Sequence, residues 1–490
     1  MATSYPQLVQ LVASYRWQRG WHYWHSGRQR AALGQWRRLP QALGWSNGET
    51  YAQLGYELQH TVGQDAADVC LQWGPQRGWR SPPPSPPSSE TPTPPETSPT
   101  ADAKQETAPE DSTDWLALGD LHRENKDFLQ ASEAYFKAVE GSDKKTVSRS
   151  WLRLLHLPVS ESMVASVAER YADLAKRYPT DYRPVTNLGR LFSFHQQPDK
   201  AIAAHREGSR RRTQEIHKGE LPPDWDDNST VPPHYIIIGA QKCGTSSLNS
   251  HLSKHPTVLP SIIKETYFFT EPAFYSYGPR WYLSHFPRLK SDTRFITGEA
   301  SPRYLHHPKV PERMVQLFPT IKLIVLLRSP SDRFISQYHH WRSRGYESRS
   351  LEEVVRISLE HWKDVPPERV QKNQEHFSLK YYPDDPNDDP SYFYRGIYAH
   401  HLKRWLEYFP REQLLVLTLD EMIQEPNTTF NRVCDFLGIP NCDLKEYRAV
   451  NQGQYSTNST QDQCREVLAE AFAPHDQQLE ALLQRPLPWR

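Results

Sequence analysis

The stretch Tyr235-Ile-Ile-Ile-Gly-Ala-Gln-Lys-Cys-Gly-Thr-Ser-Ser-Leu248 decides the fold class of this chain. Its opening apolar run shows no polar alternation, which predicts a strand buried on both faces. Gly239 and Gly244 then bracket a short loop, and a helix is expected to begin at Thr245. The first N–H groups of such a helix have no intrahelical acceptors and carry partial positive charge, so the stretch predicts a phosphate-binding loop.

The polar residues of this loop also suit an anion. Lys242 supplies a full positive charge, and Thr245 and Ser246 supply hydroxyl donors. A nucleotide triphosphatase would read Gly-x4-Gly-Lys-Ser/Thr. Here the lysine lies two residues before the second glycine, and no clear apolar run leads to an Asp that could hold Mg²⁺. We therefore expect a phosphate anchor without the usual metal–nucleotide apparatus.

A second anion site is predicted about eighty residues later, in the stretch 322–338, KLIVLLRSPSDRFISQY. A buried strand ends at Arg328, Pro330 suits the first turn of a helix, and Ser336 follows about two turns along. Arg328 and Ser336 can converge on a second phosphate, the arginine through its fork of donors. Taken alone, Arg328 reads better as a salt-bridging residue at a strand end, and Ser336 as a plain surface serine. Paired with the first loop, the two residues favour the phosphate.

The pattern of apolar residues from about residue 231 predicts an α/β domain. Three apolar, β-rich runs (YIIIGA, KLIVLL and QLLVLTL) alternate with helical spacing at 398–409 and 427–437. Buried strands separated by helices are typical of a parallel sheet covered on both faces. The fold class is therefore α/β, with a P-loop-like parallel sheet flanked by helices.

The two anion loops together resemble the 5′-phosphosulfate and 3′-phosphate loops of sulfotransferases that use 3′-phosphoadenosine 5′-phosphosulfate (PAPS). The likeness is greatest to heparan-sulfate-type and bacterial carbohydrate sulfotransferases. It covers roughly 231–490 and includes the blocks KETYFF, GEASPRYL, GIYAHHLKRWLEYFP and VCDFLGI. The resemblance implies the sulfotransferase fold. It also implies transfer of a sulfuryl group from PAPS, the co-substrate, to a hydroxyl or amine of a carbohydrate or other glycoconjugate, with no metal.

The resemblance also implies roles for individual residues. Lys242 would contact the phosphosulfate bridge, and Glu265 would act as the general base that takes the acceptor's proton. Arg328 and Ser336 would bind the 3′-phosphate. Glu265 has a plainer alternative, a surface glutamate that pairs with Lys264. The residues expected around the 5′-phosphate are Gln241, Lys242, Cys243, Gly244, Thr245 and Ser246.

Several positions depart from the heparan-sulfate pattern, so the acceptor of those enzymes is not carried over. Tyr267 and Thr270 stand where His and Asp are common, and Gln452 precedes Gly453 where Lys-Gly is expected. The block 299–302, Glu-Ala-Ser-Pro, lacks the lysine of Glu-Lys-x-Pro. We expect Glu299, Ser301 and Arg303 to line the acceptor side.

The front of the chain has a different organisation. Residues 1–80 form a Trp-rich region predicted to be helical, and residues 81–112 a linker rich in Pro, Ser and Thr. Residues 113–215 repeat with a period near 34 in the manner of tetratricopeptide repeats (TPR), beginning with Trp115, Leu118 and Gly119. Such an array predicts a protein partner. The sequence does not say whether it packs on the 231–490 sulfotransferase domain.

Charge and cysteine content indicate the class of ligand and the cellular compartment. The 58 Lys and Arg balance the 58 Asp and Glu, which gives no reason to expect nucleic acid. Residues 231–345, however, carry 15 basic against 6 acidic side chains, as an anionic co-substrate requires. Five cysteines, no signal-like start and no membrane-length apolar run predict a cytoplasmic protein. Two alternatives stay open: a P-loop kinase acting on a small molecule, and a TPR scaffold with an inactive sulfotransferase-like domain.

Overall fold

A computed structural model describes five stretches of the chain. The predicted Trp-rich region 1–80 and the linker 81–112 lie outside them. The described residues are 114–141, 143–343, 346–362, 392–444 and 459–490. No helix in these stretches is both long enough and apolar enough to cross a bilayer.

A four-stranded parallel sheet forms the centre of the α/β region, in the order β2-β1-β3-β4. The strands are β1 (Tyr235–Gly239), β2 (Gly298–Ala300), β3 (Lys322–Leu327) and β4 (Leu414–Thr418). Tyr235 pairs with Gly298 on one side and with Lys322 on the other, and Leu323 pairs with Leu414. Every residue of β1 is buried, as its unbroken apolar sequence predicts.

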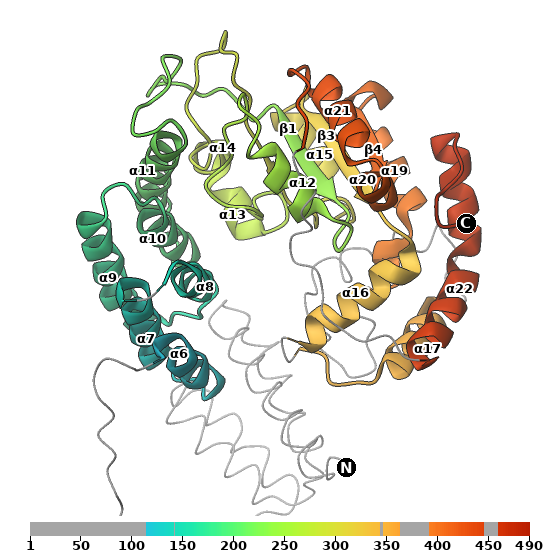
Figure 1. Ribbon diagram of the computed structural model, residues 1–490, viewed down its shortest axis with the longest axis horizontal. Coiled ribbons are helices and arrows are strands. Elements are labelled where there is room, and N and C mark those ends of the chain that lie inside the picture. The colour runs from blue at the N-terminus through green and yellow to red at the C-terminus, as the bar shows by residue number, and fades with distance from the viewer. Residues whose placement is uncertain (1–113, 142, 344–345, 363–391, 445–458) are drawn as a thin grey trace, which may run out of the picture. The chain divides into compact units, whose positions relative to one another are not determined.

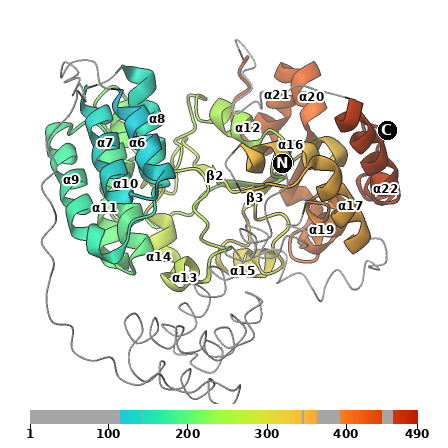
Figure 2. The same cartoon turned by 90° about the horizontal axis from the view of Figure 1, so that it is seen from below.

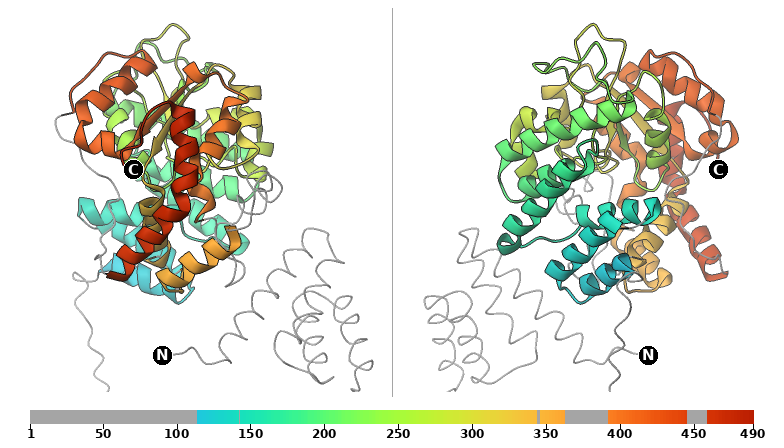
Figure 3. Two further views of the ribbon diagram at one scale, coloured as in Figure 1. Left: turned by 90° about the vertical axis from the view of Figure 1, so that its right-hand side faces the viewer. Right: turned by 60° about the vertical axis from the view of Figure 1, so that its left-hand side comes forward.

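Helices surround this sheet (Figure 1), which confirms the predicted α/β fold class. Two of them begin where the sequence indicated, at Thr245 and Pro330. The longest, at the C-terminal end of the described residues, is α22 (Figure 3). The helices of this region are α12 (Thr245–Leu252), α13 (Pro272–Ser276), α14 (Gly278–Leu283), α15 (Val310–Leu317), α16 (Pro330–Arg342), α17 (Leu351–Trp362), α19 (Tyr398–Leu406), α20 (Leu419–Gln424), α21 (Pro426–Leu437) and α22 (Ser459–Leu483), with 3-10 turns η3 (Tyr394–Gly396) and η4 (Arg411–Gln413).

The segment before the sheet consists of α-helices that lie side by side (Figure 2). Asp114 and Asp143 cap the first and third of them by accepting hydrogen bonds from backbone N–H groups. The helices are α6 (Trp115–Glu124), α7 (Phe128–Gly141), α8 (Lys144–Leu155), α9 (Val164–Arg177), α10 (Arg183–Phe194) and α11 (Pro198–Ile216), with the 3-10 turn η2 (Glu161–Met163). Helix was predicted here; the tetratricopeptide assignment stays a prediction.

The last hairpin of this helical array, α10–α11, packs on the α/β region. Ala201 and Ile202 of α11 belong to the same buried core as the strands. Ser193 of α10 accepts a hydrogen bond from the Tyr277 hydroxyl at 2.9 Å through its carbonyl and one from the Trp281 indole at 3.0 Å through its hydroxyl. The array and the α/β region therefore share an interface.

Candidate active site

The order of the strands places the two predicted anion loops next to each other. From β1 the chain continues to β2 on one side of the sheet, whereas β3 and β4 lie on the other side. In open parallel sheets, ligands bind at the carboxyl ends of the strands where the order reverses in this way. That point lies between β1 and β3, and the Ala240 N–H donates to the Leu326 carbonyl at 2.8 Å there. The loops after β1 and β3 are therefore neighbours.

The first loop brings backbone close to the start of α12. Gly244 caps this helix with φ +90°, a left-handed conformation that favours glycine. A Cβ added there would lie 2.8 Å from Leu419 Cδ1, so the position has no room for a side chain. Lys242 also has positive φ, at 70°. Thr245 is buried and Ser246 half-buried, and at a helix start their N–H groups have no intrahelical acceptor.

Two residues of the first loop turn their side chains toward the protein. The Gln241 side-chain carbonyl accepts a hydrogen bond from Arg395, which is itself buried. The Cys243 thiol is fully buried, and this burial raises its pKa. Gln241 and Cys243 thus hold the loop in place through their side chains.

One tyrosine of α19 connects the two loops. The Tyr398 hydroxyl donates to the backbone carbonyl of Arg328 at 3.0 Å, and Cys243 Sγ lies 3.6 Å from the same hydroxyl. Tyr398 is buried, so water does not compete for these contacts. No local pattern of the sequence singles out Tyr398, although it lies in the GIYAHHLKRWLEYFP block.

The second loop carries a partly exposed guanidinium. Arg328 follows β3 directly, and its side chain is 25% exposed. The Arg328 guanidinium lies 3.9 Å from the Asp332 carboxylate, the limit for an ion pair, and Asp332 also accepts a hydrogen bond from Arg465 of α22 at 3.0 Å. Ser336 is half-buried on α16. Arg328 is thus at the strand end and Ser336 on the next helix, as expected, and the Arg328 charge is only weakly neutralised.

The predicted base, Glu265, lies in a conformationally unusual loop. Both Glu265 and Tyr267 have positive φ, at 68° and 58°, which costs free energy for residues with side chains. The Glu265 carboxylate pairs with Lys264 and accepts a hydrogen bond from the Tyr267 hydroxyl at 3.1 Å. Burial alone would raise the pKa of Glu265, but the Lys264 charge and these hydrogen bonds outweigh it and lower the pKa below its ordinary value. The pairing with Lys264 was the plainer alternative, and the structure contains it.

A buried carboxylate holds this loop in place. Glu299, in the middle of β2, is fully buried and accepts hydrogen bonds from the Thr266 hydroxyl at 3.2 Å and the Thr266 N–H at 3.3 Å. The hydroxyls of Tyr282, Ser301 and Tyr304 donate to it at 2.7, 2.8 and 3.2 Å. Burial raises the pKa of Glu299 despite these donors.

The expectation that Glu299 and Ser301 line the acceptor side is wrong. Both side chains are buried, and the Ser301 hydroxyl donates a hydrogen bond to the Glu299 carboxylate. Arg303 is buried as well, but its guanidinium lies 5.5 Å from the centre of the Tyr267 ring and its charge helps to lower the pKa of Glu265. Glu299 is therefore a support for the Glu265 loop, whereas Arg303 is beside it.

The comparison with protein families agrees with this geometry. Residues 232–467 match the family model described as "Sulfotransferase domain". This part of the chain is therefore similar to sulfotransferase domains.

Three curated relatives match parts of the chain. A membrane-associated sulfotransferase, kil1, from Dictyostelium discoideum is 25% identical over 53% of this chain and 66% of its own length. The mouse heparan sulfate glucosamine 3-O-sulfotransferase 5 is 32% identical over 42% of this chain and 54% of its length. The mouse bifunctional heparan sulfate N-deacetylase/N-sulfotransferase 4 is 31% identical over 42% and 22%. The chain thus spans less than two thirds of the length of each relative.

A solved structure matches the same region. The sulfotransferase from Alicyclobacillus acidocaldarius is 29% identical, with a TM-score of 0.40, over 53% of this chain and 98% of that protein.

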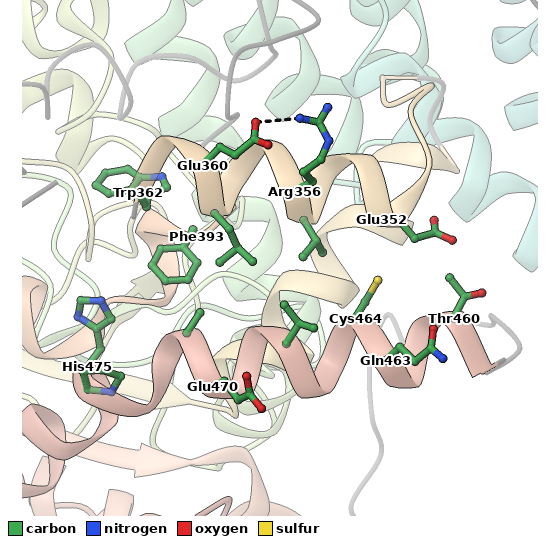
Figure 4. A pocket seen from close by; sticks show the side chains of 15 residues that line it. Glu352, Arg356, Glu360, Trp362, Phe393, Thr460, Gln463, Cys464, Glu470 and His475 are labelled. Carbon is green, nitrogen blue, oxygen red and sulfur yellow. Dashed lines mark hydrogen bonds and ion pairs between the residues drawn. The ribbon is translucent and has the colours of Figure 1, made fainter. Parts of the chain in front are cut away.

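One pocket of the described residues is lined by α17 and α22 and not by the anion loops. It has a volume of about 920 Å³ between α17 and α22, with an apolar floor and a rim that includes Glu352, Glu360 and Glu470 (Figure 4). None of the predicted site residues lines it. Within the described stretches, no three His, Cys, Asp or Glu side chains are grouped in a way that could hold a metal ion.

Proposed function

We propose that this sulfotransferase domain transfers a sulfuryl group from PAPS to a hydroxyl or amine of an acceptor. The observation that carries the proposal is the adjacency of two cationic loops, those of Lys242 and Arg328, at the reversal point of the parallel sheet. Two anion sites side by side suit a nucleotide with phosphate groups at both the 5′ and 3′ positions. ATP carries no 3′-phosphate for Arg328 and Ser336 to bind.

The first loop fits the 5′ end of such a nucleotide. Gly244 caps α12 in a left-handed conformation, and the N–H groups that follow it have no intrahelical acceptor. The N–H groups and hydroxyls of Thr245 and Ser246 would donate to the phosphate. Lys242 would offset the negative charge that grows on the leaving phosphate, which is the kind of electrostatic stabilisation that lowers reaction barriers most.

Glu265 acts as the base in this proposal. When bound, PAPS supplies a sulfuryl group whose bond to the 5′-phosphate breaks as the acceptor oxygen or nitrogen bonds to sulfur. The lowered pKa keeps the Glu265 carboxylate ionised at neutral pH, so it is able to take the proton that the acceptor releases. Lys264 and Tyr267 orient the carboxylate, and Glu299 holds the intervening Thr266.

For the acceptor we propose a carbohydrate or other glycoconjugate. Two of the relatives are named for heparan sulfate, which supports this class without fixing the sugar or the position. A protein partner for the helical array and a cytoplasmic location belong to the same proposal; the small and odd number of cysteines supports the location.

Transfer of ³⁵S from labelled PAPS to polysaccharide and glycolipid extracts tests the reaction. We expect labelled product with the full chain and none with Lys242→Ala. Calorimetry with 3′-phosphoadenosine 5′-phosphate (PAP) and with ATP·Mg²⁺ tests the co-substrate, and we expect PAP to bind more tightly. Tighter binding of ATP·Mg²⁺ would instead indicate a kinase. Tight PAP binding without any transfer would indicate an inactive scaffold.

A further inference from the structure

The α10–α11 hairpin of the helical array contacts the segment that carries the proposed base on both sides of Glu265. Before it, the Arg212 guanidinium donates to the Ile262 carbonyl at 2.9 Å. After it, Ser193 bonds to Tyr277 and Trp281, and the Phe194 ring packs edge-on against a neighbouring ring at 5.2 Å. The hairpin therefore forms one wall beside the Glu265 loop.

Arg190 is the charged residue of α10 on this wall. It precedes Ser193 by three residues, so the two share one face of the helix. Its guanidinium lies 5.1 Å from the centre of the Phe194 ring. Its charge is close enough to interact with both Glu265 and Tyr267, and its Nε is buried without a hydrogen-bond acceptor among the described residues.

The charges around Glu265 do not balance. Lys264, Arg303 and Arg190 all act on it. Lys264 pairs with Glu265 itself, and Arg303 lies 3.4 Å from the Glu271 carboxylate. Arg190 is left without a carboxylate at ion-pair distance in the part of the chain that the structure describes. A guanidinium that is partly desolvated and lacks an acceptor is well suited to bind a planar anion in bidentate fashion.

We propose that Arg190 is a specificity-determining residue contributed by the helical array, and that it binds a carboxylate or sulfate group of an anionic acceptor beside Glu265. This inference rests on the proposed sulfuryl transfer. The acceptor's anion would face Arg190 while its hydroxyl or amine faces the base. The array would then take part in acceptor selection, in addition to any partner that it binds.

The test compares two sugars that differ mainly in one charge, p-nitrophenyl β-glucuronide and p-nitrophenyl β-glucoside. Binding of each to the full chain saturated with PAP is measured by ligand-observed NMR, so the result does not depend on turnover. We expect the wild type to prefer the glucuronide, and Arg190→Gln to reduce this preference about ten-fold, as loss of a hydrogen bond to a charged group predicts.

Two further variants separate recognition from folding. Arg183→Gln changes an arginine of the same helix that already pairs with Asp181 at 2.7 Å, so the preference should persist. Arg190→Lys keeps the charge without the fork and should retain part of the preference, which makes the test decisive even if Arg190→Gln fails to fold. A wild type that binds both sugars equally, or an Arg190 variant that keeps the full preference, would overturn the inference.

Measurements of transfer activity distinguish a failure of the Arg190 proposal from a failure of the proposed sulfuryl transfer. With a transferable anionic acceptor, Arg190→Gln should raise KM and leave PAP affinity unchanged. A wild type that shows the Arg190-dependent preference but never transfers sulfur would refute the proposed reaction and not the binding site. Transfer with an unchanged KM in Arg190→Gln would refute the role of Arg190 alone.

Discussion

The hydroxyl of Tyr398 and the backbone carbonyl of Arg328 form a 3.0 Å hydrogen bond, and this bond couples the two anion loops. The same hydroxyl contacts Cys243 in the first loop at 3.6 Å. A single side chain of α19 thus fixes the spacing between the sites proposed for the 5′ and 3′ phosphates. A ligand that spans both sites should be sensitive to this spacing.

Replacing Tyr398 should therefore weaken PAP binding although the residue need not touch the nucleotide. Tyr398→Phe keeps the ring and removes the hydroxyl, and we expect a loss of about 0.5–1.5 kcal/mol, or roughly two- to ten-fold in Kd by calorimetry. Tyr394→Phe is the matched control, because its hydroxyl donates to the His306 carbonyl, away from both loops. Equal PAP affinity in wild type and Tyr398→Phe would show that the loops do not need this link.

Removing either loop cation should affect PAP binding more strongly. Lys242→Ala and Arg328→Ala each remove a charge-assisted contact, which predicts a loss of about 1.5–3 kcal/mol, or about 10- to 100-fold in Kd. The exposed Lys254, just beyond α12, provides a control of the same charge, and Lys254→Ala should bind PAP normally. Unchanged affinity in the Lys242 and Arg328 variants would refute both loop assignments.

Glu265→Gln should separate binding from chemistry. The amide keeps the shape of the side chain but cannot take a proton, so kcat should fall by about 10²- to 10⁴-fold while PAP affinity stays the same. Single-turnover ³⁵S transfer measures the chemical step. Near-normal turnover would eliminate Glu265 as the base.

The pH profile offers an independent check on the same residue. The pKa of Glu265 is lower than its ordinary value of 4.5, with the Lys264 charge as the leading cause of the lowering. The carboxylate form should persist until the pH falls below that value. Lys264→Met removes the charge, raises the pKa of Glu265, and should move the acidic limb of kcat/KM to higher pH. If the acidic limb of kcat/KM does not move, a group other than Glu265 determines its position.

Glu299→Ala should destabilise the loop that carries Glu265. Its removal leaves several buried hydroxyls and the Thr266 N–H without their acceptor, which costs about 1–3 kcal/mol in the free energy of unfolding. The loop of Glu265 would relax, so kcat should fall more than PAP affinity. Glu299→Gln retains one carbonyl acceptor and should recover part of both quantities; identical effects of the two variants would argue against positioning by hydrogen bonds.

Acid should loosen the interface between the helical array and the sulfotransferase domain. Burial lowers the pKa of His285 from 6.5 to about 4, and that of the adjacent His205 well below its ordinary value. Both rings are neutral in the folded protein, so their contribution to stability is fully present above pH 6.5 and declines as the pH falls toward 4. Each histidine contributes a slope of up to about 1.4 kcal/mol per pH unit.

Urea unfolding between pH 7 and pH 4.5 measures this slope. His285→Gln removes one titrating group and should make the decline shallower, whatever its effect at pH 7. A decline that is equally steep in the variant would show that other groups control the acid sensitivity.

Much of the sheet could be predicted from the sequence, because three of its strands are continuous apolar runs. The strand β2 could not, since the residue at its centre is Glu299, and a charged residue in a short segment reads as exposed. Its burial depends on hydroxyl donors from Tyr282 and Tyr304, which no local pattern reveals. Tyr398 was missed for a similar reason, because its role depends on loops 70 and 155 residues away.

The contact between the helical array and the α/β region could not be predicted from local sequence patterns either. Ser193 and Trp281 are 88 positions apart, and each looks unremarkable in its own helix. The family likeness predicts roles for Lys242, Glu265, Arg328 and Ser336. It could not place Arg190, because the array is not part of that likeness.

The interface of α11 with the sheet core has a consequence for how this protein can be divided. Ala201 and Ile202 share the core of the strands, so a cut between 216 and 231, where the helical array ends, would expose apolar surface on both pieces. A transplantable enzyme module would have to begin before α10, at about Arg183. The last helical hairpin is therefore a structural part of the α/β unit, although Leu191 of α10 also belongs to the core of the preceding helices.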